Sequence, residues 1–161
     1  VGLWKALTTG VVDVLTSAHN PISVDQKDQD YPNCPSGAPS VQTMVPLMLD
    51  QVSKGAISLE TLADLTSAGP ARIFNVANKG RIAVGYDADF AFVDLKKEWL
   101  LDDDDVQSGC GWDFHAGCSF TGQVIGTVIR GEKIMWDGEL LVPPSGRAIK
   151  FHDTFKEYDA Q

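Results

Sequence analysis

Within the first fifteen residues, apolar side chains first recur at helical spacing and then form a nearly uninterrupted apolar run. Residues 2–9 carry apolar positions at helical spacing and are followed by Gly10, which predicts a short helix closed by a glycine. The run 11–15, Val-Val-Asp-Val-Leu, is β-branched and nearly all apolar. Such a run is typical of a strand buried on both faces of a parallel sheet, so we expect a strand here.

A polar stretch rich in turn-forming residues, 16–39, follows and predicts a long loop. Apolar residues then recur at helical spacing over 41–52, with Pro46 expected in or near the first turn. A further helix is expected to begin at Ser58, to break at Gly69-Pro70 and to resume for one turn. The first half of the chain is therefore predicted to be mainly helical around a single strand.

After Asn78 the apolar period changes from helical to alternating. This change predicts antiparallel β structure from Arg81 to Ile149. Asp137-Gly138 is a strong signal for a two-residue hairpin, because both residues tolerate the positive φ angles of a type I′ turn.

Composition narrows the class of protein. The 161 residues include 13 Lys and Arg against 22 Asp and Glu, a formal net charge of −9, which disfavours a nucleic-acid partner. No apolar run approaches the ~18 residues of a transmembrane helix, so no membrane partner is expected. Three cysteines and the absence of a leader pattern favour a cytoplasmic protein. Because the sequence opens at Val1 within an amphipathic segment, we interpret it as a piece of a longer chain.

Candidate chemistry lies just after the predicted strand, because (β/α) barrels place their catalytic groups at the carboxyl ends of their strands. His19 is the candidate there, either as a metal ligand or base, or as a histidine hydrogen-bonded within the loop. Zinc needs three or four ligands, and this neighbourhood offers one imidazole. The two readings of His19 stay open at this point.

Several blocks of the chain resemble dihydroorotases, members of the cyclic-amidohydrolase superfamily. Residues 12–21, the stretch Pro35-Ser36-Gly37-Ala38-Pro39 and the block 65–74 carry the likeness to dihydroorotase itself. The stretch Gly85-Tyr86-Asp87-Ala88-Asp89 is shared across the wider superfamily.

The resemblance implies an α/β plus β fold, in which the last strand and helices of a metal-dependent (β/α)8 TIM barrel are followed by a small β-sandwich. Residues 1–76 would be the C-terminal part of the barrel, and residues 77–161 the β-sandwich domain. A full barrel takes ~250 residues, so the partner expected first is the missing N-terminal barrel portion.

The family hydrolyses dihydroorotate reversibly to carbamoyl aspartate in pyrimidine biosynthesis, at a zinc centre whose ligands lie mostly on strands upstream of this segment. The motif Ser-Asp-His-Ala-Pro-His is implied to supply an Asp that binds metal and moves the proton, and a final His that contacts substrate. Here it reads Ser17-Ala18-His19-Asn20-Pro21-Ile22, so the Asp position is Ala18 and the final His position is Ile22. No catalytic residue is therefore expected in this segment, and His19 is the one weak metal candidate. Ser36 and Gly37 are implied to line the substrate pocket.

Another departure lies further along, where the family's usual Gly-Trp-Thr-Pro-Phe is Gly111-Trp112-Asp113-Phe114-His115. These departures predict a dihydroorotase-like amidohydrolase with impaired or lost activity, and they leave open whether the zinc that the resemblance implies is retained. One alternative is a non-catalytic structural subunit that partners aspartate transcarbamoylase, and a homo-oligomer is also open. The other is an amidohydrolase acting on another cyclic amide, with Asp25 or Asp28 as its base.

Overall fold

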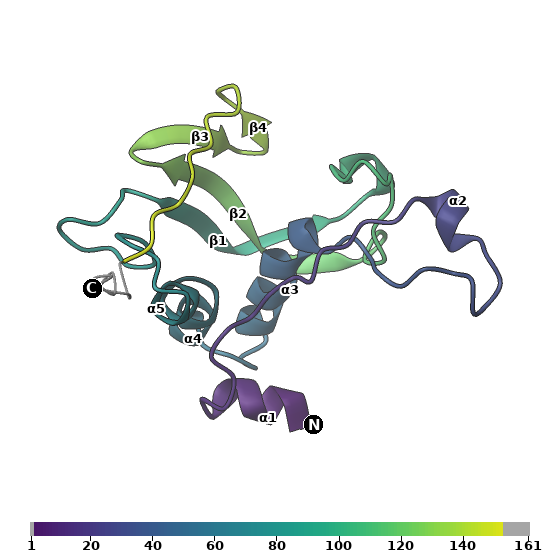
Figure 1. The fold of residues 1–161 in the computed structure, drawn as a ribbon, viewed down its shortest axis with the longest axis horizontal. Coiled ribbons are helices and arrows are strands. Elements are labelled where there is room, and N and C mark those ends of the chain that lie inside the picture. Colours follow the sequence, from purple (N-terminus) through teal and green to yellow (C-terminus); the bar gives the residue numbers. More distant parts are fainter. Residues whose placement is uncertain (1, 153–161) are drawn as a thin grey trace, which may run out of the picture. The chain divides into compact units, whose positions relative to one another are not determined.

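The computed structural model describes residues 2–152 of the chain (Figure 1). The helical elements are concentrated in the first half and the strands in the second. In chain order the elements are α1 (Gly2–Thr8), α2 (Val24–Lys27), α3 (Val41–Ser53), α4 (Leu59–Ala63), the π-helical turn η1 (Asp64–Ala68), α5 (Gly69–Ile73), β1 (Phe90–Leu100), the 3₁₀ turn η2 (Asp103–Asp105), β2 (Ser119–Ile129), β3 (Glu132–Trp136) and β4 (Glu139–Leu140). The predicted helices at 2–9, over 41–52 and from Ser58 are confirmed.

The strands form one four-stranded sheet in the order β1-β2-β3-β4. Strands β2 and β3 pair antiparallel, as do β3 and β4, and the second pairing is closed by Asp137 and Gly138 at φ 50° and 87°. The hairpin predicted at Asp137-Gly138 is thus confirmed. The described residues form no second sheet facing this one, so the β-sandwich remains a prediction.

Residues 11–15 do not form the predicted strand. Val11 is 73% exposed, and the segment is irregular. Leu15 donates its N–H to the carbonyl of Leu65 at 2.9 Å, but among residues 2–152 no strand pairs with the segment. A parallel strand is defined by hydrogen bonds to its neighbours, so the buried-strand pattern does not produce a strand where those neighbours are not present.

The predicted β region is also shorter than expected. Residues 81–89 and 141–149 carry no strand, so the sheet occupies 90–140. Ile82, whose alternation with Val84 suggested a strand, is 85% exposed. A turn hydrogen bond from Tyr86 N–H to the Ala83 carbonyl bends the chain here, which prevents an extended pairing.

The break predicted at Gly69-Pro70 is replaced by continuous helical structure. The π-helical turn η1 precedes Gly69, and α5 begins at that residue with proline in its first turn. Proline lacks an N–H, and its ring collides with the carbonyl four residues earlier in an α-helix. The turn before Pro70 is π-helical, so its carbonyls are not placed as in an α-helix and the helix continues through this position.

The chain divides into two compact units. Within the described residues, the first unit comprises 2–15, 59–92 and 125–152, and the second comprises 16–58 and 93–124. The second unit has the larger core, which is formed by Thr43, Met48, Leu49, Ile57, Leu101 and Phe120. The predicted domain boundary between residues 76 and 77 stays a prediction, and Val1 and 153–161 lie outside the described residues.

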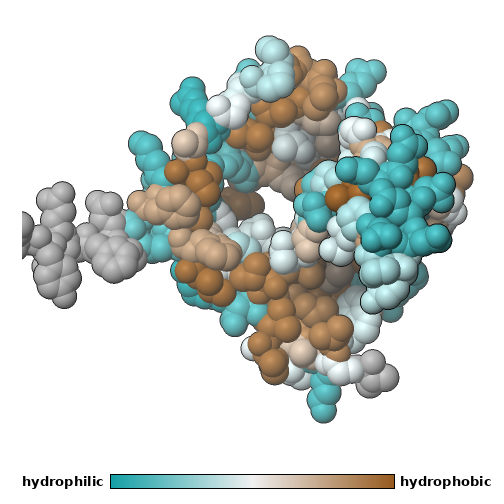
Figure 2. All heavy atoms as spheres, turned by 45° about the vertical axis from the view of Figure 1, so that its right-hand side comes forward, coloured by the Kyte–Doolittle hydropathy of each residue, from teal (hydrophilic) through white to brown (hydrophobic). Residues whose placement is uncertain are grey.

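Hydrophobic side chains remain on the surface of the chain, and Figure 2 shows them gathered in several brown areas on one face. Leu3, for example, is 81% exposed. None of the helices in the described part of the chain has the length and apolar character that crossing a membrane requires.

Candidate functional site

His19 is hydrogen-bonded to the start of helix α3. Its Nδ1 accepts the backbone N–H of Ser40 at 3.0 Å and that of Val41 at 3.3 Å. The first N–H groups of a helix have no partner within the helix, so an acceptor at this place stabilises the helix end. The structure therefore supports the reading of His19 as a histidine hydrogen-bonded within the loop.

Ser40 is the N-cap residue of α3, but its side chain does not bond to the helix. Its Oγ instead donates to the carbonyl of Ser17 at 2.5 Å. The imidazole of His19 thus serves as the acceptor that a Ser side chain commonly provides at this position.

The loop around Gly37 lies against Asn20. The N–H of Asn20 donates to the Ala38 carbonyl at 3.0 Å, and its side-chain Nδ2 donates to the Ser36 carbonyl at 3.4 Å. Gly37 has φ +120°, and a Cβ built on it would lie 2.4 Å from Asn20 Nδ2. Only glycine fits here, because both the backbone angle and the contact exclude a side chain. Ser36 and Gly37 are thus placed beside the motif segment, while their role in a substrate pocket stays a prediction.

The other end of the motif segment is held by a residue far along the chain. Trp112 donates its Nε1–H to the carbonyl of Ile22 at 2.7 Å, across 90 positions of sequence. The sequence marks Trp112 as an aromatic within a glycine-rich stretch, but no local pattern pairs it with Ile22.

Next to Trp112 lies a buried carboxylate. The side chain of Asp113 is 3% exposed and accepts the Thr43 hydroxyl at 3.2 Å and the His115 N–H at 2.9 Å. The Nδ1 of His115 lies 3.2 Å from the same carboxylate. These partners satisfy both oxygens of Asp113, which is what a buried carboxylate requires.

A cavity of about 210 Å³ opens beside these groups. It is lined by His19, Pro39, Ser40, Val41, Gln42, Gln107, Ser108 and Asp113. Since Nδ1 of His19 accepts hydrogen bonds, a neutral imidazole carries its proton on Nε2 and offers a donor from its other edge.

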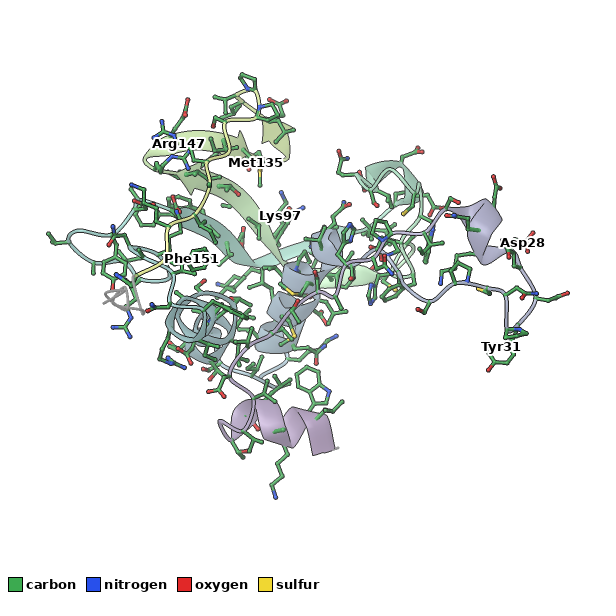
Figure 3. All side chains as sticks on the ribbon, in the orientation of Figure 1. Asp28, Tyr31, Lys97, Met135, Arg147 and Phe151 are labelled. Atoms are coloured by element: carbon green, nitrogen blue, oxygen red, sulfur yellow. The ribbon has the colours of Figure 1, made fainter. Side chains whose placement is uncertain are left out.

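Ala18 lies in the middle of this framework and contributes no polar side-chain atom. Its backbone has φ 48°, in the left-handed region, and its N–H donates to Thr16 Oγ1 at 3.4 Å. Asp25 and Asp28, the alternative bases, are both exposed, and Figure 3 shows Asp28 at the outer end of the loop next to α2.

The described residues do not form a metal centre by themselves. Within 2–152 there is no group of three or more His, Cys, Asp and Glu side chains placed to hold a metal ion. The residues present therefore do not fit a zinc ion without ligands from elsewhere, and His19 has one nitrogen engaged with α3.

A second set of bonded charges occurs in the first unit. Lys79 forms ion pairs with Asp87, at 2.8 Å, and with Asp89, and Asp89 also accepts the Arg130 N–H at 2.8 Å. The two hydrogen bonds to carboxylates raise the pKa of Lys79 above its ordinary value, although burial opposes this. Burial alone would raise the pKa of Asp89, but the bonds from Lys79 and Arg130 outweigh it and lower that pKa. We name Lys79, Asp87 and Asp89 the charged latch.

The comparisons with known proteins agree on one family. The sequence profile of the Amidohydrolase family matches residues 2–134. The chain is 37% identical over 149 residues to the dihydroorotase of Pyrococcus furiosus, covering 92% of this chain and 34% of that protein. It is 35% identical to the allantoinase of Rubrobacter xylanophilus, with 92% of this chain and 33% of that protein covered.

Solved structures of a hydantoinase and of a dihydropyrimidinase also match the chain. The chain matches the L-hydantoinase (dihydropyrimidinase) from Arthrobacter aurescens with a TM-score of 0.83 and 33% identity, covering 87% of this chain and 32% of that one. It matches the dihydropyrimidinase from Brevibacillus agri with a TM-score of 0.82 and 28% identity, covering 87% of this chain and 32% of that one. The chain thus spans about a third of the length of the relatives it matches, and the likeness to dihydroorotases predicted from its motifs is confirmed.

Proposed function

Because the chain belongs to the amidohydrolase family, we propose that it is the C-terminal portion of a dihydroorotase-like protein in which hydrolysis is impaired or lost. The observation that supports this most directly is Ala18, an alanine at the position where the motif resemblance implies the family's proton-transferring Asp. The surrounding segment keeps a bonded framework through His19, Asn20 and the Ile22 carbonyl. The proposed loss is therefore one of chemistry and not of local structure.

Opening a cyclic amide requires a group that takes a proton from the attacking water and delivers one to the leaving nitrogen. General acid–base assistance of this kind contributes roughly 10²–10⁴ in rate. The methyl group of Ala18 has neither a lone pair nor an exchangeable proton, so it does neither. A metal bound in such an enzyme supplies Lewis acidity, and zinc here would need ligands outside residues 2–152.

Substrate contact is expected to be weakened as well. The final His position of the motif is Ile22, whose side chain offers no hydrogen bond, while its carbonyl is occupied by Trp112. Ser36 and Gly37 remain packed on Asn20, so the loop that the resemblance implies for the substrate pocket keeps its place beside the motif segment. We propose that the protein still binds a cyclic amide although it no longer hydrolyses it efficiently.

The test is restoration in the full-length protein. Ala18→Asp with Ile22→His is expected to raise dihydroorotate hydrolysis by about 10²-fold or more, and Ala18→Asp alone to raise it further than Ile22→His alone. Ala18→Asn is the matched control, since it has the same shape as Asp without the charge. Consumption of dihydroorotate is followed at several zinc concentrations, together with the zinc content of each variant. Wild-type protein that already turns over at rates normal for enzymes of this type contradicts the proposal.

A second candidate is a non-catalytic subunit, a role in which the framework is kept for a partner. The candidate partners of such a subunit are the N-terminal barrel portion, a second copy of the protein, and aspartate transcarbamoylase, which it would meet in the cytoplasm. If the double variant Ala18→Asp with Ile22→His binds zinc but shows no dihydroorotate hydrolysis, the result favours the non-catalytic subunit. Co-elution of the full-length protein with aspartate transcarbamoylase on size-exclusion chromatography would test the partner directly.

A third candidate is hydrolysis of another cyclic amide, which the similarity to an allantoinase at 35% identity favours. Its base would be Asp25 or Asp28, both exposed on the loop after the motif. Assaying wild-type protein with allantoin and hydantoin beside dihydroorotate tests it. This third candidate would replace the first if the protein hydrolyses allantoin or hydantoin and if Asp25→Asn or Asp28→Asn lowers that rate while Asp104→Asn does not.

A further inference from the structure

We propose that His19 is a positioning residue that holds the start of helix α3 to the motif segment through Nδ1, and is not a metal ligand. The assignment goes beyond the proposed function, since it concerns how the loop is held and applies whether or not the protein hydrolyses its substrate.

A neutral imidazole has one nitrogen with a free lone pair and one that carries a proton. In this structure the lone pair of Nδ1 faces two N–H donors, from Ser40 and Val41. The proton is then on Nε2, and a metal needs a lone pair at that nitrogen. As long as His19 bonds to α3, its free edge is a hydrogen-bond donor.

Nothing else close in sequence replaces this acceptor. The Ser40 hydroxyl, which would ordinarily accept from the first turn, is turned to the Ser17 carbonyl. The start of α3 therefore depends on a side chain supplied 21 residues earlier in the sequence. Because the same helix begins directly after the Gly37 loop, His19 also fixes where that loop ends.

The orientation of His19 has a consequence for the neighbouring cavity of about 210 Å³. Nε2–H is a donor on the edge of the ring that α3 does not occupy, and Asp113 in the cavity wall already has its oxygens bonded to Thr43 and His115. A group that meets His19 from the cavity is expected to be a carbonyl or carboxylate oxygen and not a cation.

Two substitutions separate the nitrogens of His19. In His19→Asn the Oδ1 atom occupies the place of Nδ1, so the acceptor for α3 is kept. In His19→Gln the side-chain carbonyl reaches the place of Nε2, so the acceptor for α3 is lost. Ser36→Ala, whose backbone carbonyl makes the contact with Asn20, is the matched loop control that leaves α3 unchanged.

Hydrogen exchange of the full-length protein reads out the helix start. In His19→Gln the amides of Ser40 and Val41 are expected to exchange about fivefold to tenfold faster than in the wild type, the size of a lost helix cap, and in His19→Asn within about twofold of it. The zinc content of both variants is expected to equal that of the wild type. Equal acceleration in Asn and Gln, or loss of zinc in both, overturns the proposal.

A spectroscopic readout keeps the test decisive if His19→Gln does not fold. In wild-type protein labelled with ¹⁵N-histidine, the resonances that vanish in His19→Asn identify residue 19. We expect the nitrogen shifts of the tautomer protonated at Nε2, unchanged when zinc is added. A proton on Nδ1, or a shift of Nε2 on addition of zinc, would show that His19 is a ligand or a free loop histidine.

Discussion

The motif segment 17–22 and the charged latch at 79–89 are both loops that hydrogen bonds hold in place, but they use different groups to do so. In the charged latch the bonds are made by the ionised side chains themselves, since Lys79 lies between Asp87 and Asp89. In the motif segment they are made by the backbone and by His19 and Asn20.

This difference decides which substitutions each loop tolerates. Removing the Lys79 charge from the charged latch leaves Asp87 and Asp89 without their shared counter-ion, which is costly. The side chain at position 18 takes part in none of the bonds described for the motif segment, so the alanine found there leaves those bonds in place. The structure thus gives a physical reason why Ala18 and Ile22, whose side chains carry no polar group, are compatible with a hydrogen-bonded motif segment.

The largest expected effect tests whether the motif segment really depends on close backbone packing. Gly37→Ala is expected to lower the free energy of unfolding by about 2–4 kcal/mol, because it combines an unfavourable φ with a Cβ at 2.4 Å from Asn20. Gly55→Ala is the matched control in the same unit, since Gly55 also has a positive φ but open space around it, and about 1 kcal/mol is expected. Urea unfolding of the full-length protein measures both. Equal losses would mean that the packing of Gly37 on Asn20 contributes nothing.

The second effect tests the charged latch. Lys79→Met is expected to lower the free energy of unfolding by about 2 kcal/mol, less than for a fully buried pair because the lysine and both aspartates keep some contact with water. Adding Asp87→Asn should recover part of this loss by removing one of two facing carboxylates. Lys97→Met, at an exposed lysine of β1, is the control (Figure 3) and is expected to change stability by less than about 0.5 kcal/mol. A single Lys79→Met variant as stable as its control would remove the contrast between the two loops.

The comparison also shows which features a sequence reveals. Helix α3 and the hairpin at Asp137-Gly138 are recognisable because their signals are local, an apolar period and a pair of turn residues. The strand expected at 11–15 and the alternation around Ile82 are equally local signals, but strands exist through their partners, and in residues 2–152 neither segment has one.

The candidate site follows the same rule. The motif itself identifies His19, Ala18 and Ile22 in the sequence, and a bonded role for His19 is among the readings that the sequence leaves open. What completes the site comes from distant positions, with Ser40 bonded to His19 and Trp112 to Ile22. Such pairings are set by tertiary packing, so the periodicity and spacing of residues in the sequence do not predict them.

The third expected effect concerns a buried carboxylate in the same compact unit as the motif segment. Asp50, at 6% exposure on α3, accepts hydrogen bonds from Lys54 and from the N–H of Thr121 at the start of β2. Burial alone would raise the pKa of Asp50, but these bonds outweigh it and hold the pKa below 3.8. Asp50→Asn is expected to cost about 1–2 kcal/mol at pH 7, limited because Lys54 is well exposed.

The pH dependence of that difference has a definite sign. A carboxyl whose pKa is lowered by folding contributes its stability above the ordinary pKa and loses it as the pH falls through the lowered value. The gap between wild type and Asp50→Asn should therefore be constant from pH 7 to about pH 5 and shrink below about pH 4. Asp104→Asn, at an exposed acid, is the control. A gap that widens on acidification would show that Asp50 is not held in its ionised form.

The smallest expected effect concerns the backbone at Ala18. Its φ of 48° lies in the left-handed region, which costs a residue with a Cβ roughly 1 kcal/mol and is tolerated better by Asp, Asn and Gly. Ala18→Gly is therefore expected to raise the free energy of unfolding by about 0.5–1 kcal/mol, whereas Ala63→Gly, within α4, should lower it by about 1 kcal/mol. Thermal unfolding of both variants beside the wild type measures the pair. If Ala18→Gly is stabilising, the backbone at position 18 has a left-handed conformation that suits Asp better than alanine, which is the geometry that the proposed Ala18→Asp restoration needs. If Ala18→Gly destabilises as much as Ala63→Gly, position 18 is an ordinary alanine site, and restoring Asp there has no preformed geometry to return to.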